Sequence, residues 1–284
     1  GIGKNRRKTV GFGKYCKKAR EYDHEIYIRE LSIIDGGIGC ALWDAAIILT
    51  RFIYEHGEKL FKDKNVLELG AGVGLPGICA GRFGKRVVLS DYLEGVVDNL
   101  QYNVWLNGKA QVEEMGLDEL NEDDDLNTEE KQKLQYLRKV HESTESVLLD
   151  WYQPDHLKDY QEKFDILLGS ELTYTGSIDT IKHLIQVIDE TITKKGVFLE
   201  ILSDDRDGVH AFLDLIVEEH GYFYSIHNVS EKYIGNYGTG QKTETYKLYL
   251  LGKDKDDELF KNFQECLGPI FKTNIESDEN AVQE

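Results

Sequence analysis

Residues 66 to 77 read VLELGAGVGLPG, and Asp91 ends the next apolar run, VVLSD. The first apolar residues predict a short buried strand, and the glycines at 70, 72 and 74 allow a loop whose backbone a ligand can approach closely. A helix is expected to open near Leu75. An acid about 20 residues after such a glycine loop is placed to hold ribose hydroxyls. The stretch therefore predicts a site for a nucleoside-containing cofactor.

Two classes of cofactor fit this loop. Residues 72 to 77 match G-x-G-x-x-G, the dinucleotide fingerprint. Glu68, however, stands two residues before the first glycine, and a carboxylate at this mouth disfavours a pyrophosphate. S-adenosylmethionine carries a sulfonium and an amino group and no phosphate, so Glu68 favours it over NAD. The structural alternatives are a tight turn without a ligand, and Asp91 as a cap for the helix that begins near Tyr92.

The composition indicates a globular protein. With 284 residues, 40% of them hydrophobic, the chain can bury one sizeable core. No apolar run approaches the roughly 18 residues of a membrane span, and the basic N-terminus lacks the apolar segment of a secretory signal. The four cysteines form no C-x-x-C pair, which argues against a disulfide scaffold or a zinc site and for a reducing compartment; they are Cys16, Cys40, Cys79 and Cys266.

The charge distribution is strongly uneven. The net charge is −18 and the isoelectric point is about 4.9. An acidic surface repels nucleic acid and attracts basic partners, although solubility alone explains it equally well. Residues 1–20 carry eight basic side chains and no acid. This arm is either a solvated terminus, a nucleic-acid contact or a nuclear signal.

From residue 65 onward, apolar segments with strand and helix patterns alternate. This predicts an α/β fold with an open, doubly wound, mostly parallel seven-stranded sheet. No helix fits between the last two strands, so they are expected to form an antiparallel hairpin. The expected strands are 65–69, 86–90, 146–149, 164–168, 196–202, 222–229 and 244–251, and the helices are 41–55, 75–83, 93–106, 177–192 and 207–220.

Four blocks together carry a resemblance to a known family: LWDAA at 42–46, ELGAGVG at 68–74, LDW at 149–151 and ELTY at 171–174. The chain resembles the seven-strand, class I adenosylmethionine-dependent methyltransferases, specifically the methyltransferase-like 21 type of protein lysine methyltransferases. The likeness runs from about 37 to 251. It excludes the basic arm, the insertion and the tail. We therefore expect a basic N-terminal arm with a strand or hairpin (1–36), a methyltransferase domain (37–252) interrupted by an acidic insertion (113–145), and a C-terminal helix with a disordered tail (253–284).

The resemblance implies a cofactor site for S-adenosylmethionine. Trp43 would pack near the methionine part, and Asp150 would accept a hydrogen bond from the adenine amino group. Trp151 would cover the adenine or shape the substrate edge. Their structural alternatives are a core anchor, a cap and a surface aromatic. The full implied set is Trp43, Glu68, Gly70, Ala71, Gly72, Gly74, Asp91, Tyr92, Asp150, Trp151 and Ser170.

The fourth block implies the catalytic residues, Glu171 and Tyr174. Methyl transfer is an in-line displacement that needs an uncharged amine. A free lysine has a pKa of about 10.4, so it must lose a proton before it attacks. The Glu171 carboxylate would hold the incoming ammonium, and Tyr174 would wall the channel with help from a cation–π contact. Water could carry the proton away. The family more often has Asp at the first position, and Glu171 could instead cap the next helix.

The sequence thus predicts a protein N-methyltransferase that acts on lysine and releases S-adenosylhomocysteine. The alternatives are a protein arginine or histidine methyltransferase, a small-molecule N-methyltransferase, and a catalytically silent module of the same fold. A base-methylating enzyme is disfavoured because ELTY stands where that class has Asn/Asp-Pro-Pro-Tyr/Phe. We expect a basic protein segment as partner, no membrane or nucleic acid, a monomer, no bound metal, and a cytoplasmic or also nuclear location.

Overall fold

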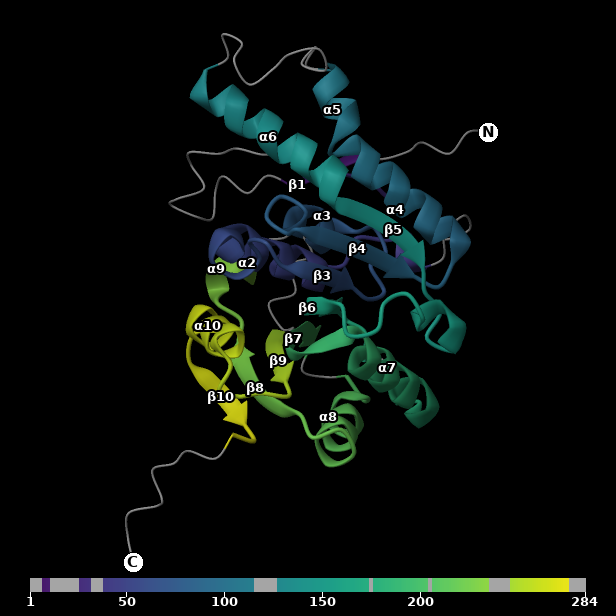
Figure 1. The fold of residues 1–284 in the computed structure, drawn as a ribbon, viewed down its shortest axis with the longest axis vertical. Coiled ribbons are helices and arrows are strands. Elements are labelled where there is room, and N and C mark those ends of the chain that lie inside the picture. The colour runs from purple at the N-terminus through teal and green to yellow at the C-terminus, as the bar shows by residue number, and fades with distance from the viewer. Residues whose placement is uncertain are drawn as a thin grey trace, which may run out of the picture.

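A single eight-stranded sheet organises the chain in this computed structural model (Figure 1), which describes residues 7–10, 26–31, 38–114, 127–173, 176–203, 206–234 and 246–275. Its strands are β3 (Asn65–Glu68), β4 (Arg86–Asp91), β5 (Thr144–Leu148), β6 (Phe164–Ser170), β7 (Ile192–Ser203), β8 (Phe223–Asn228), β9 (Tyr246–Gly252) and β10 (Ile270–Thr273). They lie in the order β10-β8-β9-β7-β6-β3-β4-β5.

The direction of the strands confirms the predicted fold class. β5, β4, β3, β6 and β7 pair in parallel. β9 lies between β7 and β8 and is antiparallel to both, so the last two predicted strands are indeed an antiparallel pair. β10 adds an eighth strand along β8 that the sequence did not predict. It is only four residues long, and its side chains are exposed, so it leaves no apolar pattern.

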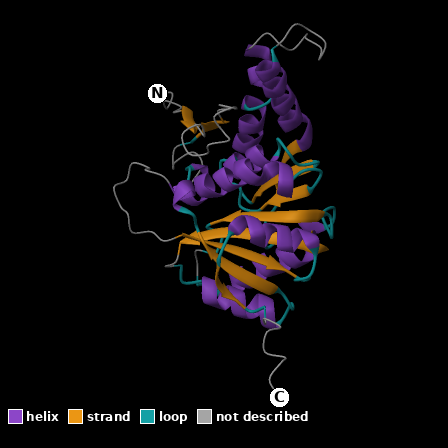
Figure 2. Ribbon diagram, turned by 90° about the vertical axis from the view of Figure 1, so that its left-hand side faces the viewer, coloured by secondary structure: helices purple, strands orange, loops and turns teal. Residues whose placement is uncertain are grey.

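Helices cover both faces of the sheet (Figure 2). On one face lie α2 (Asp44–Leu60), α3 (Leu75–Ala80), α4 (Glu94–Leu106) and α10 (Glu258–Leu267); on the other lie α7 (Ile178–Thr191) and α8 (Val209–Glu218). β7 shows why two cores form, because successive side chains of a strand point to opposite faces. Leu199 and Ile201 pack in the first core, and Phe198 and Leu202 pack in the second.

The remaining elements are β1 (Arg7–Val10), β2 (Ile26–Arg29), η2 (Ile38–Cys40), α5 (Lys109–Glu114), α6 (Thr128–Ser143), η3 (Pro154–Leu157) and α9 (Glu231–Ile234). β1 and β2 form a two-stranded antiparallel sheet. α6 begins with a capping box between Asn127 and Glu130, and α5 and α6 extend beyond the edge of the main sheet (Figure 2). The acidic run at 122–125 lies outside the described residues. Among the described helices, each is too short or too polar to span a membrane.

A ladder of buried asparagines on α4 and at its C-cap holds β2 in place. Asn99, Asn103 and Asn107 are spaced by four residues and therefore share one helix face. Asn107 accepts a hydrogen bond from the Tyr27 amide (2.7 Å) and donates one to the Tyr27 carbonyl (2.6 Å). Asn103 accepts from the Arg29 amide at 2.9 Å. These side-chain amides satisfy the backbone of β2 as a neighbouring strand would.

Candidate active site

A cavity of about 800 Å³ opens where β3, β4, β5 and β6 end. After β3 the chain turns to α3 on one face, and after β6 it turns to α7 on the other. Loops that diverge in this way leave a crevice at the carboxyl ends of the strands. Ten of the thirteen predicted site residues line this cavity: Trp43, Gly70, Ala71, Gly72, Asp91, Tyr92, Asp150, Trp151, Ser170 and Glu171. Tyr174 lies outside the described residues.

The glycine loop after β3 has a backbone that only glycine adopts easily. Gly70, Gly72 and Gly74 have φ angles of 54°, 56° and 80°. A Cβ on Gly72 would lie 2.6 Å from the carbonyl oxygen of Gly39, and a Cβ on Gly70 would lie 2.7 Å from Leu172 Cδ2. The loop is therefore packed tightly against two other walls of the cavity.

Glu68 and Gly74 do not line the cavity. Glu68 shares a strand face with Val66, which packs in the core beneath α2 and α3. The Glu68 carboxylate therefore lies under α3. There it accepts a hydrogen bond from the Gly77 amide at 2.8 Å, and burial raises the pKa of Glu68 to about 8. A Cβ on Gly74 would meet Leu100 at 2.7 Å. The structure therefore gives both residues a place in packing α3, outside the wall of the predicted cofactor site.

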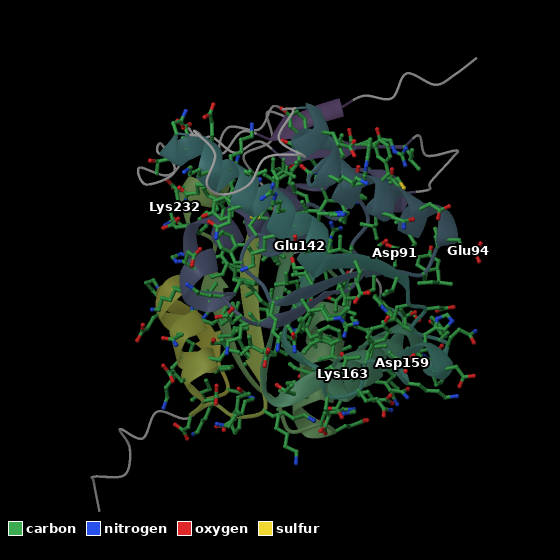
Figure 3. All side chains as sticks on the ribbon, turned by 45° about the horizontal axis from the view of Figure 1, so that its top comes forward. Asp91, Glu94, Glu142, Asp159, Lys163 and Lys232 are labelled. Carbon is green, nitrogen blue, oxygen red and sulfur yellow. The ribbon has the colours of Figure 1, made fainter. Side chains whose placement is uncertain are left out.

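Asp91, at the end of β4, is bound by backbone donors from two loops. Its Oδ1 accepts from the amides of Tyr92 (2.8 Å) and Leu93 (3.3 Å), and its Oδ2 accepts from Gly72 at 3.3 Å. Burial raises the pKa of Asp91. Since the Gly72 amide already donates to a carboxylate, it is not available to a phosphate. In the view of Figure 3, Asp91 and Glu94, at the start of α4, are labelled on the opposite side from Lys232 on α9.

Aromatic side chains surround the end of the cavity next to β5. Asp150 and Trp151 follow this strand, and Asp150 Oδ1 accepts from the Tyr152 amide at 3.0 Å. The Tyr152 hydroxyl lies 2.8 Å from Thr180 Oγ1, on the first turn of α7. Tyr152 and Thr180 also line the cavity, although the sequence did not single them out. Tyr152 directly follows the LDW block, which was the one available signal for it.

Another part of the cavity wall comes from residues 38–43, ahead of α2. Gly39, Ala41 and Trp43 line the cavity, and Trp43 is 46% exposed. The Leu42 amide donates to Glu30 Oε1 at 3.0 Å. This wall is therefore tied to the segment that follows β2.

Glu171, directly after β6, is held by the end of β7. Its backbone has a φ of 60°, unusual for a residue with a side chain. Its amide donates to the Ile201 carbonyl at 2.9 Å, and its Oε1 accepts from the Ser203 amide at 3.0 Å. Its Oε2 forms a salt bridge with Arg206. The predicted amine-binding carboxylate thus already has a cationic partner in the cavity wall.

Arg206 is the charged residue of this site that sequence reasoning missed. It lines the cavity and follows β7 within the run SDDRDG. A single basic residue among acids, immediately after a strand that ends at the same edge, was the signal that could have found it. The charged lining residues, among those described, are three carboxylates (Asp91, Asp150 and Glu171) and this guanidinium. The wall therefore suits a cationic ligand without phosphate.

Comparison with known proteins places this geometry in context. Residues 21–138 match the family model described as lysine methyltransferase. Over 192 residues the chain is 27% identical to mouse protein-lysine methyltransferase METTL21E, covering 66% of this chain and 67% of that protein. It is 33% identical over 175 residues to the protein N-terminal and lysine N-methyltransferase EFM7 of Kluyveromyces lactis, covering 59% and 58%.

A third relative carries a different name. The Xenopus laevis histone-arginine methyltransferase METTL23 is 32% identical over 120 residues, covering 41% of this chain and 51% of that protein. The chain thus spans between half and two thirds of the length of these relatives. The solved structure of M. jannaschii TYW2 with AdoMet overlaps with a TM-score of 0.46 at 14% identity, covering 88% and 86% of the two chains, an overlap too weak to compare sites.

Proposed function

We infer a methyl-transfer function for this chain, which the family model and the relatives identify as a class I S-adenosylmethionine-dependent methyltransferase of the methyltransferase-like 21 type. The acceptor that we propose is the side-chain nitrogen of lysine in a protein. The observation that carries this proposal is the cavity itself: a glycine loop in left-handed conformation, packed between an acid-lined floor and the Glu171 turn. The family resemblance predicted from four sequence blocks is confirmed.

The residues present fit S-adenosylmethionine. Gly70 and Gly72 leave their backbone open to close approach, and Asp91 and Asp150 can accept from ribose and adenine donors. When bound, the cofactor supplies an electrophilic methyl group on a sulfonium sulfur. The acidic wall would stabilise that positive charge, and Trp43, Trp151 and Tyr152 supply apolar surface to the lining of the cavity.

The chain's own contribution to the reaction centres on Glu171. A lysine ammonium that enters beside Glu171 meets a carboxylate already paired with Arg206. We propose that the ammonium displaces the guanidinium and pairs with the Glu171 carboxylate. This pairing would hold the nitrogen at the end of the cavity where the methyl group of the cofactor would lie. The ammonium must then lose a proton to water, because only the neutral amine has the lone pair that attacks. Tyr174 stays a prediction as the second channel residue.

Arginine methylation is the second candidate. One observation favours it: Glu171 already binds a guanidinium within the cavity wall, that of Arg206. Carboxylate and guanidinium are well matched in shape and charge, so a substrate arginine could occupy the same place. The relatives named as histone-arginine methyltransferases are consistent with this.

Two experiments test the proposed function in turn. Calorimetry with S-adenosylhomocysteine should show binding, and the Gly72→Val variant should lose it. The protein is then incubated with S-adenosylmethionine labelled in its methyl group and with a cell lysate, and the labelled proteins are digested to find the modified residue. Label on lysine supports the main proposal, and label on arginine supports the second. Label confined to small molecules or RNA would overturn both.

We also propose a cytoplasmic location. Cys40, Cys79 and Cys266 are free thiols, which suits a reducing compartment. A fluorescent fusion of the full chain tests this, and removal of the basic residues of the arm tests whether they direct the chain to the nucleus.

A further inference from the structure

The side chain of Glu200, in β7, reaches across to the turn that follows β6. Its Oε1 accepts hydrogen bonds from two successive backbone amides, those of Leu172 at 3.0 Å and Thr173 at 3.2 Å. Glu200 is fully buried and is absent from the described lining of the cavity. The two amides have turned away from the β-ladder, so this one oxygen replaces the strand partner that they would otherwise need.

The turn held by Glu200 lies between the glycine loop, on the proposed cofactor side of the active site, and Glu171, on the proposed acceptor side. It begins at Glu171, whose φ of 60° is a conformation that a residue with a side chain keeps only when its surroundings enforce it. The next residue, Leu172, lines the cavity. Leu172 also packs against the glycine loop so closely that a Cβ on Gly70 would lie 2.7 Å from its Cδ2. A shift of the turn would therefore move both the Glu171 carboxylate and a neighbour of the cofactor site.

The surroundings of Glu200 favour its neutral form. Its second oxygen, Oε2, is buried and has no hydrogen-bond partner among the described residues, so a negative charge there would be uncompensated. Burial raises the pKa of Glu200 to about 8, and the charge of Glu171 adds to the effect. Arg206 neutralises Glu171 from the loop after β7. The neighbours of Glu200 on its own strand face, Phe198 and Leu202, are apolar, and Tyr249 is its partner on β9.

We propose that Glu200 is a positioning residue for methyl transfer: it fixes the Glu171–Thr173 turn and thereby the place of the acceptor nitrogen. This inference rests on the proposed function, since it assigns the turn to the acceptor side of that same site. Glu200 acts through the turn and does not itself touch either substrate. A neutral carboxyl accepts both amides without placing a charge behind Glu171.

Amide hydrogen exchange measures the proposed contact without any need for activity. Glu200→Ala should raise the exchange rates of the Leu172 and Thr173 amides by about tenfold or more, because both lose their acceptor. The Ala71 amide, which bonds to the Ser90 carbonyl at 2.8 Å, should be unchanged. Glu200→Gln keeps an acceptor oxygen and should exchange like the wild type. Asp214→Ala, at an exposed acid on α8, controls for the loss of a carboxyl side chain elsewhere in the protein. Unchanged rates in Glu200→Ala would overturn the proposal.

Kinetics then test whether the turn matters for transfer. Glu200→Ala should lower kcat by about 10- to 100-fold, since small misplacements of reacting groups have effects of this size, while the Kd for S-adenosylhomocysteine changes less than about threefold. Glu200→Gln should restore kcat at pH 7, and wild-type activity should fall relative to Glu200→Gln above pH 8. Faster exchange in Glu200→Ala with wild-type kcat would refute the positioning role. No transfer by the wild type would refute the proposed function instead, while the exchange rates still decide whether Glu200 holds the turn.

Discussion

The cavity has two halves: a cofactor half around the glycine loop, Asp91 and Asp150, and an acceptor half around Glu171. Behind each half a buried glutamate accepts hydrogen bonds from backbone amides, and the two glutamates differ in the segment that they hold. In the cofactor half, the buried Glu68 accepts the Gly77 amide in the first turn of α3. In the acceptor half, the buried Glu200 accepts the Leu172 and Thr173 amides. Burial raises the pKa of each carboxyl to about 8. Glu68 thus supports a helix that its own backbone hydrogen bonds also stabilise. Glu200 supports a turn that has few other hydrogen bonds to stabilise it.

The comparison shows which interactions fix the geometry of each half. The glycine loop is fixed by close backbone packing: Gly72 lies against the Gly39 carbonyl, where a Cβ would have only 2.6 Å. The acceptor half is fixed by charges and hydrogen bonds around Glu171, namely the Ser203 amide and Arg206. Backbone packing keeps its form under most conditions. A charge network can exchange partners, which suits the proposed entry of a lysine side chain from another protein.

The largest expected effect comes from Glu171→Gln, which should separate the two halves. The variant cannot form the proposed ion pair with the substrate ammonium. Removing one partner of a buried charge pair typically costs about 2–5 kcal/mol, so methyl transfer should fall by about 30-fold or more. The affinity for S-adenosylhomocysteine should stay within about threefold of wild type, because Glu171 serves the acceptor half. Steady-state kinetics and calorimetry check the two parts. A parallel loss of cofactor affinity would show that the halves are not separable.

Gly72→Ala should have the converse effect, about a tenfold loss of affinity for S-adenosylhomocysteine. The added Cβ would press on the Gly39 carbonyl, and the left-handed backbone adds strain of about 1–2 kcal/mol. The loop relieves both by shifting, which moves the backbone that faces the cofactor. Gly221 offers a matched control, since its φ is 71° and nothing lies within 4 Å of an added Cβ. Gly221→Ala should therefore cost stability without changing the affinity. Equal affinities for the two variants would remove the close-packing argument for the glycine loop.

The pH dependence of stability compares the two buried carboxyls directly. Each has a raised pKa in the folded protein, so between about pH 4.5 and 8 the folded state binds more protons than the unfolded state, and the free energy of unfolding falls as pH rises. Glu68→Gln and Glu200→Gln should each flatten this fall between pH 5.5 and 8.5. One pKa unit corresponds to about 1.4 kcal/mol, so a change of about 1 kcal/mol or more is expected.

Urea titrations at several pH values measure this slope. Glu258→Gln, an acid in the first turn of α10, serves as a control and should leave the slope as it is. A wild-type slope in Glu200→Gln would mean that the Glu200 carboxyl is ionised throughout the range. The comparison would then hold for Glu68 alone.

The sequence predicted the cofactor half better than the acceptor half, for a physical reason. The glycine loop, Asp91 and Asp150 are local signals, since each is set by its own strand and the turn after it. Glu68 was the exception: the sequence shows that an acid precedes the loop, but only the strand face decides that its carboxylate lies under α3. The strands of the main sheet were also predictable, except β10, whose four exposed residues carry no pattern.

The acceptor half depends on contacts between distant segments, which a pattern along the chain does not encode. Arg206 is 35 residues from Glu171, and Glu200 is 28 residues from Leu172. The buried run around Glu200, VFLEILS, predicted a strand correctly, but a lone acid within such a run does not say what it holds. In the same way the asparagine ladder of α4 becomes meaningful only when β2, 70 to 80 residues away, is placed beside it.

Arg206→Gln should give the smallest effect and the sharpest test of the exchangeable network. If an entering lysine replaces the guanidinium at Glu171, removing Arg206 removes a competitor. The KM for a lysine-containing peptide substrate should then fall by about threefold, the size of a partly exposed ion pair, and kcat should change little. Lys182→Gln, an exposed cation on α7, is the matched loss of positive charge and should leave KM unchanged. A higher KM in Arg206→Gln would mean that the guanidinium orients Glu171 for the substrate, and the acceptor half would then be as fixed as the glycine loop.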